Sequence, residues 1–243
     1  MIFKGISDVG KRRSANQDCF DITDLGGGYT VLTVCDGMGG ANGGNVASET
    51  AVKAFTDHLR GNFSADADLS ALMKNAVAEA NTAVYEKSKT DKALSGMGTT
   101  LVSAMISADG SVVAVNVGDS RMYRIDGDGM RQITKDHSYV QYLVDMGQIT
   151  LKEAENASIK NIIIRSVGNE EKVTPDLFRF KLEKGDFVLL CSDGLTNCVK
   201  KDDIFGSVKA ETEDELVGCA EELIKLANDG GGTDNITVIL GKM

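Results

Sequence analysis

The stretch VLTVCDG at residues 31–37 is an apolar run that meets a small-residue turn at an aspartate, and this arrangement occurs four times in the chain. Residues 112–119 read VVAVNVGD and residues 187–194 read FVLLCSDG, whereas residues 234–240 reverse the order as DNITVIL. Short runs that are rich in Val and Ile and bounded by Gly are typical of buried β-strands. The chain is therefore predicted to carry aspartates at the ends of buried strands.

These aspartates are predicted to gather at one edge of a sheet. If the strand that follows Asp234 lies antiparallel to a neighbour, its first residue shares an edge with the last residue of that neighbour. Carboxylates brought together in this way raise one another's pKa values, and a divalent cation removes that penalty. The pattern predicts a metal site made of oxygen ligands.

The composition is typical of one compact acidic domain, with two small domains as the alternative. The chain has 243 residues, of which 42% are hydrophobic, and a net charge of −10 that argues against nucleic acid as a partner. It has no apolar run of membrane-spanning length and no signal peptide at its N-terminus. Five cysteines without a C-x-x-C pair indicate reduced thiols, so we expect a cytoplasmic protein.

Strands and helices are predicted to come in blocks. Strands are expected in residues 2–36, 98–134 and 162–192, with helices at 43–60, 66–89, 137–157 and 212–228 before a last strand. Turns are expected at residues 26–28 and 127–129, where glycines cluster. Two strand blocks separated by a pair of helices predict an α+β fold, a four-layer α-β-β-α sandwich with two antiparallel sheets in the centre.

Other phosphate and metal chemistries have weaker signals. The two histidines, His58 and His137, are isolated, so a zinc centre is disfavoured, and His137 is interpreted as a residue near a helix cap. No cysteine precedes an arginine by six residues, as a cysteine phosphatase requires, and no P-loop is present. Residues 66–70, DADLS, imitate an aspartyl-phosphatase nucleophile but follow no strand, so they are interpreted as a helix cap.

Six motifs then occur in a fixed order: GKRRSANQD at 10–18, VCDGMGG at 34–40, GMGTT at 96–100, NVGDSR at 116–121, CSDGL at 191–195 and GTDNIT at 232–237. In this order they resemble the PPM family, the metal-dependent protein serine/threonine phosphatases also called protein phosphatase type 2C. The resemblance spans residues 5–240 and is greatest to compact bacterial members.

The resemblance implies a single catalytic domain over residues 1–243, with a flap at about 137–170. Such an enzyme hydrolyses phosphoserine and phosphothreonine by attack of a water that bridges two Mg²⁺ or Mn²⁺ ions, without a covalent phosphoenzyme. It would act on phosphorylated proteins, including a cognate serine/threonine kinase whose signalling it opposes, and it would work as a monomer. A pseudophosphatase used as a binding module and a hydrolase of small phosphoesters are the alternatives.

The resemblance also implies a role for each matched residue. Asp36 would bridge the two ions, the Gly37 carbonyl would complete one of them, and Asp193 with Asp234 would bind the other. Asp18 would act from a second shell through water, and Asp119 with Asp193 would form a third, weaker site. Arg13 would bind the substrate phosphate, because a planar guanidinium suits two phosphate oxygens at once.

The chain departs from the family pattern at two places. Many eukaryotic members have histidine at the position of Met38, where it has been assigned as a general acid, and methionine cannot protonate a leaving group. Residues 156–161, NASIKN, stand where relatives often have a His-Pro pair in the flap. The single carboxylate most open to another interpretation is Asp119, because Gly118-Asp119 could equally form a tight hairpin.

Overall fold

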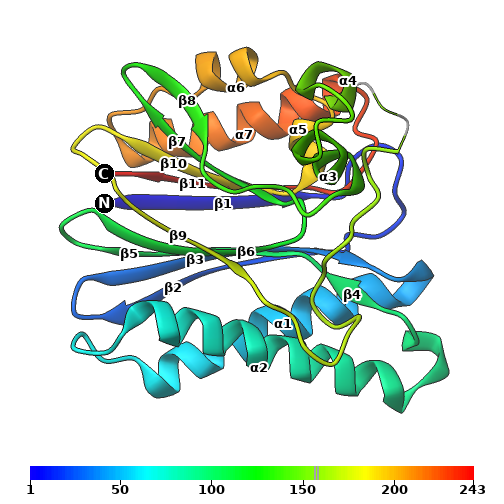
Figure 1. Cartoon of the computed structure of the whole chain (residues 1–243). Coiled ribbons are helices and arrows are strands. Elements are labelled where there is room, and N and C mark those ends of the chain that lie inside the picture. The colour runs from blue at the N-terminus through cyan, green and yellow to red at the C-terminus, as the bar shows by residue number, and fades with distance from the viewer. Residues whose placement is uncertain (156, 158) are drawn as a thin grey trace.

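Two antiparallel sheets pack face to face between two layers of helices in the computed structural model, which describes residues 1–155, 157 and 159–243 (Figure 1). The α+β sandwich expected from the strand blocks is confirmed. Both predicted glycine turns, at residues 26–28 and 127–129, are also present as connections between paired strands.

The first sheet has the strand order β1-β11-β10-β7-β8 and joins the two ends of the chain. Its strands are β1 (Ile2–Asp8), β11 (Ile236–Lys242), β10 (Phe187–Cys191), β7 (Arg121–Asp126) and β8 (Gly129–Gln132). Helices α6 (Lys201–Ser207) and α7 (Glu213–Asp229) cover its outer face, and α5 (Asp193–Thr196) follows β10 (Figure 1). Because β11 lies between β1 and β10, the last strand completes the sheet.

The second sheet has the order β2-β3-β5-β6-β9 and is covered by the two longest helices. Its strands are β2 (Asp18–Gly26), β3 (Tyr29–Met38), β5 (Leu101–Ser107), β6 (Ser111–Val117) and β9 (Asp176–Lys181), and the short β4 (Gly98–Thr99) pairs with β3. Helices α1 (Gly40–Asn62) and α2 (Leu69–Thr90) pack on its outer face, and the 3₁₀ turn η1 (Lys92–Leu94) follows them.

The run at residues 31–35 shows why the strands are apolar on both faces. Val31 and Cys35 pack toward α1 and α2, whereas Leu32 and Val34 pack in the layer between the two sheets. Successive side chains of a strand point to opposite faces, so a strand buried on both sides needs a continuous apolar run. The buried Thr33 is tolerated because its hydroxyl lies 3.0 Å from that of Ser103.

Helix α2 forms where a helix was predicted at 66–89, although it begins at Leu69. Asp68 precedes the helix, and its carboxylate accepts hydrogen bonds from the backbone N–H groups of Ser70 and Ala71. The helix buries Leu72, Met73, Ala76, Val77, Ala80 and Val84. The interpretation of residues 66–70 as a helix cap is therefore confirmed.

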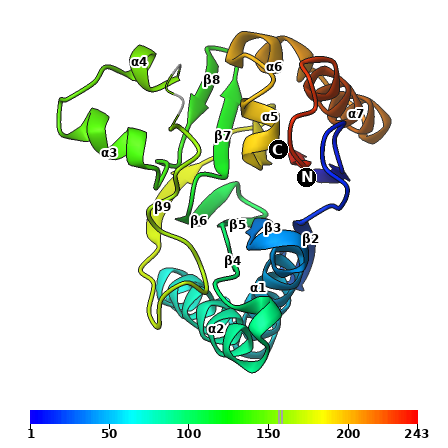
Figure 2. The ribbon, with the colours of Figure 1, turned by 90° about the vertical axis from the view of Figure 1, so that its right-hand side faces the viewer.

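The region after β8 differs from the prediction and forms a projecting lobe (Figure 2). The expected helix over 137–157 is wrong, because the chain forms two short helices, α3 (Tyr139–Asp145) and α4 (Leu151–Glu155). Gly147, with φ of +68°, lies between them in a conformation that ends a helix.

The prediction of strands from residue 162 onward is also wrong. Up to β9 the described chain makes only isolated bridges, between Thr99 and Val167 and between Ser138 and Ile163. Of the segment 156–161 that departs from the family pattern, Asn156 and Ser158 lie outside the described residues.

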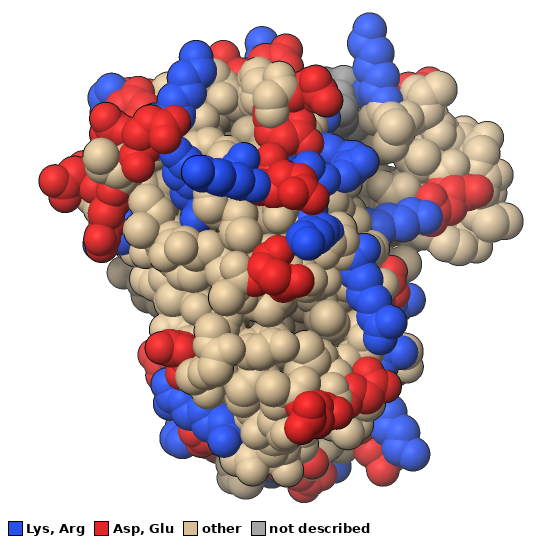
Figure 3. Space-filling model, turned by 90° about the vertical axis from the view of Figure 1, so that its left-hand side faces the viewer, with Lys and Arg blue, Asp and Glu red and all other residues tan. Residues whose placement is uncertain are grey.

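The surface is mixed in charge. On the face that carries the chain termini, Lys and Arg side chains are interspersed with Asp and Glu (Figure 3). Along the described part of the chain, no helix combines the length and apolar character needed to cross a bilayer.

Candidate active site

Strand directions bring the predicted aspartates to one end of both sheets. Strand β11 lies antiparallel to β10, with Val238 opposite Cys191, so Asp234 before β11 and Asp193 after β10 share an edge. In the other sheet β3 and β6 are both antiparallel to β5, so Asp36 and Asp119 share an edge as well. The antiparallel neighbour expected for the last strand is confirmed, and Figure 2 looks onto this end of the molecule.

Asp36 lies within a strand and not in a turn that follows one, as the run at 31–37 had suggested. It is paired with Asp18 of β2, and β3 continues to Met38 by pairing with β4. Its N–H donates to Thr100 Oγ1 over 2.9 Å, and its carbonyl accepts from Thr99 Oγ1 over 2.9 Å. These two threonines belong to the motif GMGTT, but the sequence pattern predicted no role for them.

Glycine is the one residue type that fits at position 37. A Cβ there would lie 2.0 Å from the carbonyl oxygen of Gly44 in α1 and 2.6 Å from that of Gln17. The N–H of Gly37 donates to the same Gln17 carbonyl over 3.1 Å. Strand β3 and the first turns of α1 can therefore approach closely beside Asp36.

Asp18 is held by two hydroxyl groups from the other sheet. Its Oδ2 accepts from Ser192 Oγ at 2.8 Å and from Thr237 Oγ1 at 2.7 Å. Its Oδ1 is buried and accepts no hydrogen bond from any described residue. Burial, opposed by the two hydroxyls and assisted by the charges of Asp193 and Asp234, raises the pKa of Asp18 to about 7.

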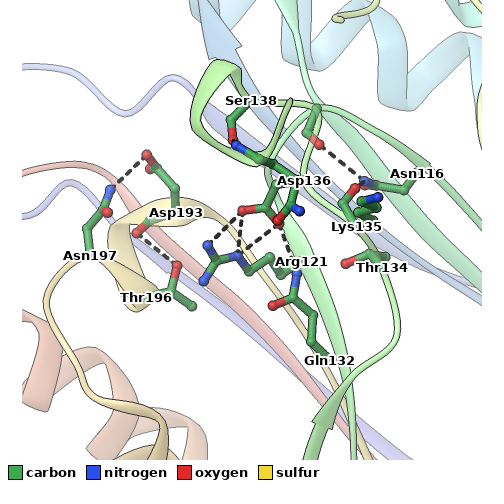
Figure 4. A network of polar contacts seen from close by, with 12 residues as sticks. Asn116, Arg121, Gln132, Thr134, Lys135, Asp136, Ser138, Asp193, Thr196 and Asn197 are labelled. Carbon is green, nitrogen blue, oxygen red and sulfur yellow. Dashed lines mark hydrogen bonds and ion pairs between the residues drawn. The ribbon is translucent and has the colours of Figure 1, made fainter. Parts of the chain in front are cut away.

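Asp193 begins α5 and also presents a buried oxygen without a donor. Asn197, one turn later, donates to its Oδ2 over 2.8 Å, whereas its Oδ1 accepts no hydrogen bond from the described chain. Figure 4 shows this pair beside Arg121 and Asp136. Burial and the neighbouring charge of Asp234 raise the pKa of Asp193.

Asp119 lies on a connection between the two sheets, so the alternative of a tight hairpin is wrong. Strand β6 belongs to one sheet and β7 to the other. Gly118 has φ of +106° and packs against Thr100, where a Cβ would lie 2.6 Å from the threonine methyl. Asp119 itself is buried, and burial together with Asp193 and Asp136 raises its pKa to about 8.

Asp36 stands at the centre of this acidic edge. Its pKa is raised well above the ordinary value, first by burial and then by the charges of four other aspartates: Asp18, Asp193, Asp119 and Asp234. All five carboxylates predicted from the sequence therefore interact electrostatically. This is the repulsion that a divalent cation would relieve.

Arg13 is the residue of the basic run that reaches the acidic edge. Its Nη2 donates to Asp234 Oδ2 over 2.8 Å, whereas Lys11 Nζ lies 3.5 Å from Asp229 on α7. The loop that carries Arg13 is fastened by Asn235, whose Nδ2 donates to the carbonyls of Val9 and Ala15. Asn235 is directly adjacent to Asp234, but sequence reasoning did not assign it a role.

The donor set suits a hard cation more than a soft one. Within the described chain, no three His, Cys, Asp or Glu side chains converge closely enough to hold an ion by themselves. Mg²⁺ keeps several waters and needs only one or two carboxylates, so carbonyl and water oxygens would complete its shell. The two carboxylate oxygens that lack donors, on Asp18 and Asp193, fit that requirement.

A cleft of about 640 Å³ opens beside these carboxylates, between the projecting lobe and α5 with α6. Its walls include Asp119 and Asp193 at the acidic edge and Val140 and Leu151 from the lobe. Arg121 also lines it and forms a bidentate pair with Asp136, through Nε to Oδ1 and Nη2 to Oδ2, and Gln132 donates to the same carboxylate (Figure 4). The cleft therefore gives access from the surface to the carboxylates of Asp119 and Asp193.

Comparisons with known proteins all lead to one family. The family model described as protein phosphatase 2C matches residues 10–225. The serine/threonine phosphatase stp of Listeria innocua is 38% identical over 236 residues, which is 96% of this chain and 92% of that protein.

Solved structures show the same likeness. The serine/threonine phosphatase Stp1 from Staphylococcus aureus superposes with a TM-score of 0.93 at 36% identity, over 100% of this chain and 95% of that one. The catalytic domain of the serine/threonine protein phosphatase PstP in complex with two manganese ions gives 0.86 at 34% identity, over 99% and 96%.

Proposed function

The chain belongs to the protein phosphatase 2C family, and from that premise we propose that the acidic edge is its catalytic metal site. The protein is a serine/threonine protein phosphatase that depends on divalent metal ions and acts on phosphorylated proteins. The binding-module and small-phosphoester alternatives receive no such support.

We propose that Asp36, the Gly37 carbonyl, Asp193 and Asp234 hold two Mg²⁺ or Mn²⁺ ions. Asp18 acts on them through water, and Asp119 with Asp193 holds a third, weaker ion. The observation that carries this assignment is that five aspartates from separate segments lie at the same end of the two sheets, two of them with buried oxygens that lack donors among the described residues. When bound, such ions would supply Lewis acidity and would lower the pKa of a water, so that it could lose a proton to solvent and attack phosphorus at neutral pH.

The side chains around the proposed ions orient the carboxylates and hold the substrate phosphate. The hydroxyls of Ser192 and Thr237 fix one oxygen of Asp18 and leave the other for the site. Asn197 does the same for Asp193. Arg13 binds the phosphate oxygens, for which its position beside Asp234, on an exposed loop, is suitable.

No imidazole is proposed as a general acid. Met38 occupies the position at which many eukaryotic members of the family have histidine, and it has no proton to give. The ring of His137 is engaged on both nitrogens, with Gly118 and with Asp176. The leaving group would therefore take its proton from water or the substrate, or leave without assistance.

We propose that residues 1–243 form one catalytic domain, with the flap at about 137–170. The apolar layer between the sheets draws on strands from both ends of the chain, which supports a single folding unit. The enzyme is proposed to be a cytoplasmic monomer that opposes a cognate serine/threonine kinase. Five unpaired cysteines suit a reducing compartment.

The test is dephosphorylation of a phosphothreonine peptide with Mn²⁺, with Mg²⁺ and with EDTA, and p-nitrophenyl phosphate as the small-phosphoester control. We expect turnover of the peptide with either ion and none in EDTA, with kcat/KM higher for the peptide than for the small ester. Asp36→Asn should abolish both activities. Full activity in a metal-stripped sample, or in Asp36→Asn, would contradict the proposed site.

A further inference from the structure

His137 forms hydrogen bonds with both the N–H and the carbonyl of Gly118, the residue that precedes Asp119. The N–H of Gly118 donates to His137 Nδ1 over 3.1 Å, and the N–H of His137 donates to the Gly118 carbonyl over 2.9 Å. Asn116 Nδ2 donates to the same carbonyl over 3.1 Å. The left-handed turn at Gly118, which directs the chain from one sheet to the other, is thus held from two sides.

The hydrogen bond from Gly118 also decides which ring nitrogen carries the proton. Because Nδ1 accepts, the proton of a neutral ring must lie on Nε2. That nitrogen lies 3.3 Å from Asp176 Oδ2 and can donate to it. Burial, assisted by the charge of Arg165, lowers the pKa of His137, so the neutral ring is favoured.

Arg165 has acceptors other than the imidazole, so it does not oppose this tautomer. Its Nη1 has two hydrogens, and two acceptors lie within reach: Asp176 Oδ1 at 2.8 Å and the Thr174 carbonyl at 3.3 Å. It therefore needs no acceptor on the imidazole, although Nε2 is 3.0 Å away. His137 and Arg165 consequently share one carboxylate, which begins β9.

His137 also lies where both ends of the flap leave the body of the protein. Its carbonyl accepts from the N–H of Ile164 over 2.9 Å, at the returning end. Ser138, the next residue, caps α3 at the departing end and forms a bridge with Ile163. His137 therefore connects three places: its side chain joins the Asp119 turn to the start of β9, and its backbone joins the two ends of the flap.

We propose that His137 is a positioning residue for the phosphatase reaction. Its Nδ1 holds the Gly118 turn so that Asp119 stays at the acidic edge. Its Nε2 contacts Asp176, which also binds Arg165 of the flap, so the turn is connected to the flap through these two residues. The inference rests on the proposed role of Asp119 in holding the weaker ion. It assigns to His137 no contact with substrate or with the two core ions.

Two isosteric substitutions separate the two nitrogens. In His137→Asn the side-chain oxygen can take the place of Nδ1, so the acceptor for Gly118 is kept and the donor to Asp176 is lost. In His137→Gln the longer amide can reach the place of Nε2, so the donor is kept and the acceptor is lost. His58→Gln on α1, far from the Gly118 turn in the sequence, is the matched control.

The readouts are Mn²⁺ titration calorimetry, kinetics with the phosphopeptide and with p-nitrophenyl phosphate, and Tm. We expect His137→Gln to weaken the third ion about 10- to 100-fold, as expected for loss of an outer support, and to leave the two core ions unchanged. His137→Asn should keep the third ion within about threefold and raise KM for the peptide but not for the small ester. A merely structural histidine would lower Tm in both variants without this crossed pattern.

Asp119→Ala distinguishes failure of the inference from failure of its premise. If that variant leaves the third ion unchanged, the role of Asp119 is wrong and that of His137 falls with it. If Asp119→Ala weakens the third ion and a folded His137→Gln does not, only the role of His137 is overturned. Should His137→Gln not fold, a third-ion loss above about tenfold in folded His137→Asn also overturns it.

Discussion

Arg13 and Asp234 form an ion pair across 2.8 Å, although they are separated by 221 positions in the sequence. One is the proposed phosphate ligand and the other a proposed metal ligand. The pair therefore couples the two halves of the site, because the guanidinium and a metal ion are both cations that interact with the same carboxylate. About half of the Arg13 side chain is exposed, so the pair itself adds little stability.

Replacing Arg13 should affect substrate and metal in opposite directions. Arg13→Ala removes a charge-assisted interaction with phosphate worth about 1.5–3 kcal/mol, so KM should rise about 10- to 100-fold and kcat should fall less. The same variant frees Asp234 from a competing cation, so Mn²⁺ affinity should rise, by about fivefold at most. Steady-state kinetics and titration calorimetry measure the two effects.

Two further variants control this prediction. Arg12→Ala should be mild, since the structure ties Arg12 to Gly232 through its backbone N–H and shows no ion pair of its side chain among the described residues. Arg13→Lys should recover only part of the KM effect, because a point charge cannot bind two oxygens at once. Equal defects in Arg12→Ala and Arg13→Ala would instead indicate a diffuse basic patch, with strong salt dependence.

Asp193 and Asp119 should differ in their effect on turnover. Asp193→Ala removes a ligand proposed for both a core ion and the weaker ion, so kcat should fall at least about 100-fold while the fold survives. Asp119→Ala should leave the two core ions bound and weaken only the third. Near wild-type kcat for purified Asp193→Ala at saturating Mn²⁺, or loss of a core ion in Asp119→Ala, would contradict the assignments.

The acidic edge could be predicted from the sequence because its information is local. Each aspartate adjoins a recognisable strand or turn. Because Val31 and Cys35 face one core and Leu32 and Val34 face another, the strand has a continuous apolar run that can be recognised in the sequence. The sandwich follows from the order of these blocks. The glycine at residue 37 was also predictable as part of a motif, although the reason, a close approach to Gly44, is a tertiary contact.

The supports of the edge could not be predicted, because they join distant segments. Ser192 and Thr237 look like ordinary strand residues, and only the packing of two sheets brings them to Asp18. His137 looks like a cap residue and meets Gly118 across 19 positions. The prediction for the flap was wrong for another reason. Its polar composition indicates a helix but does not show that Gly147 divides the helix. It also does not show that the next strand begins only at Asp176.

The stability of the metal-free enzyme should rise as the pH falls. Burial and like charges raise the pKa of Asp18 to about 7 and of Asp119 to about 8 in the folded chain, well above the values in an unfolded chain. The folded state then holds protons that the unfolded state has released, so Tm in EDTA should increase from about pH 8 to about pH 6. With Mn²⁺ the trend should weaken or reverse, because protons compete with the metal.

A neutral variant isolates this effect from the general charge of the protein. The net charge of −10 also favours the folded state on acidification, so the informative quantity is the difference in Tm slope between the wild type and Asp119→Asn. Asp119→Asn should show a shallower slope in EDTA. Identical slopes would mean that Asp119 does not change its protonation state on unfolding.

Asp18→Asn should separate the effect of the Asp18 carboxylate on stability from its effect on metal binding. The amide keeps an oxygen that can accept from Ser192 and Thr237, so the hydrogen bonds that link the two sheets can survive. It removes a buried charge that is repelled by Asp193 and Asp234, so Tm in EDTA at pH 8 should equal or exceed that of the wild type.

Turnover of Asp18→Asn should fall all the same. If Asp18 orients the core ions through water, Mn²⁺ affinity should drop about 10- to 100-fold and kcat should stay low even at saturating Mn²⁺. Ser7→Ala is the matched control, because its hydroxyl contacts Thr237 over 2.7 Å and belongs to the same chain of hydrogen bonds without contacting Asp18 in the described structure. A lower Tm in EDTA together with unchanged Mn²⁺ affinity would make Asp18 a structural residue, since only its contacts with Ser192 and Thr237 would then matter.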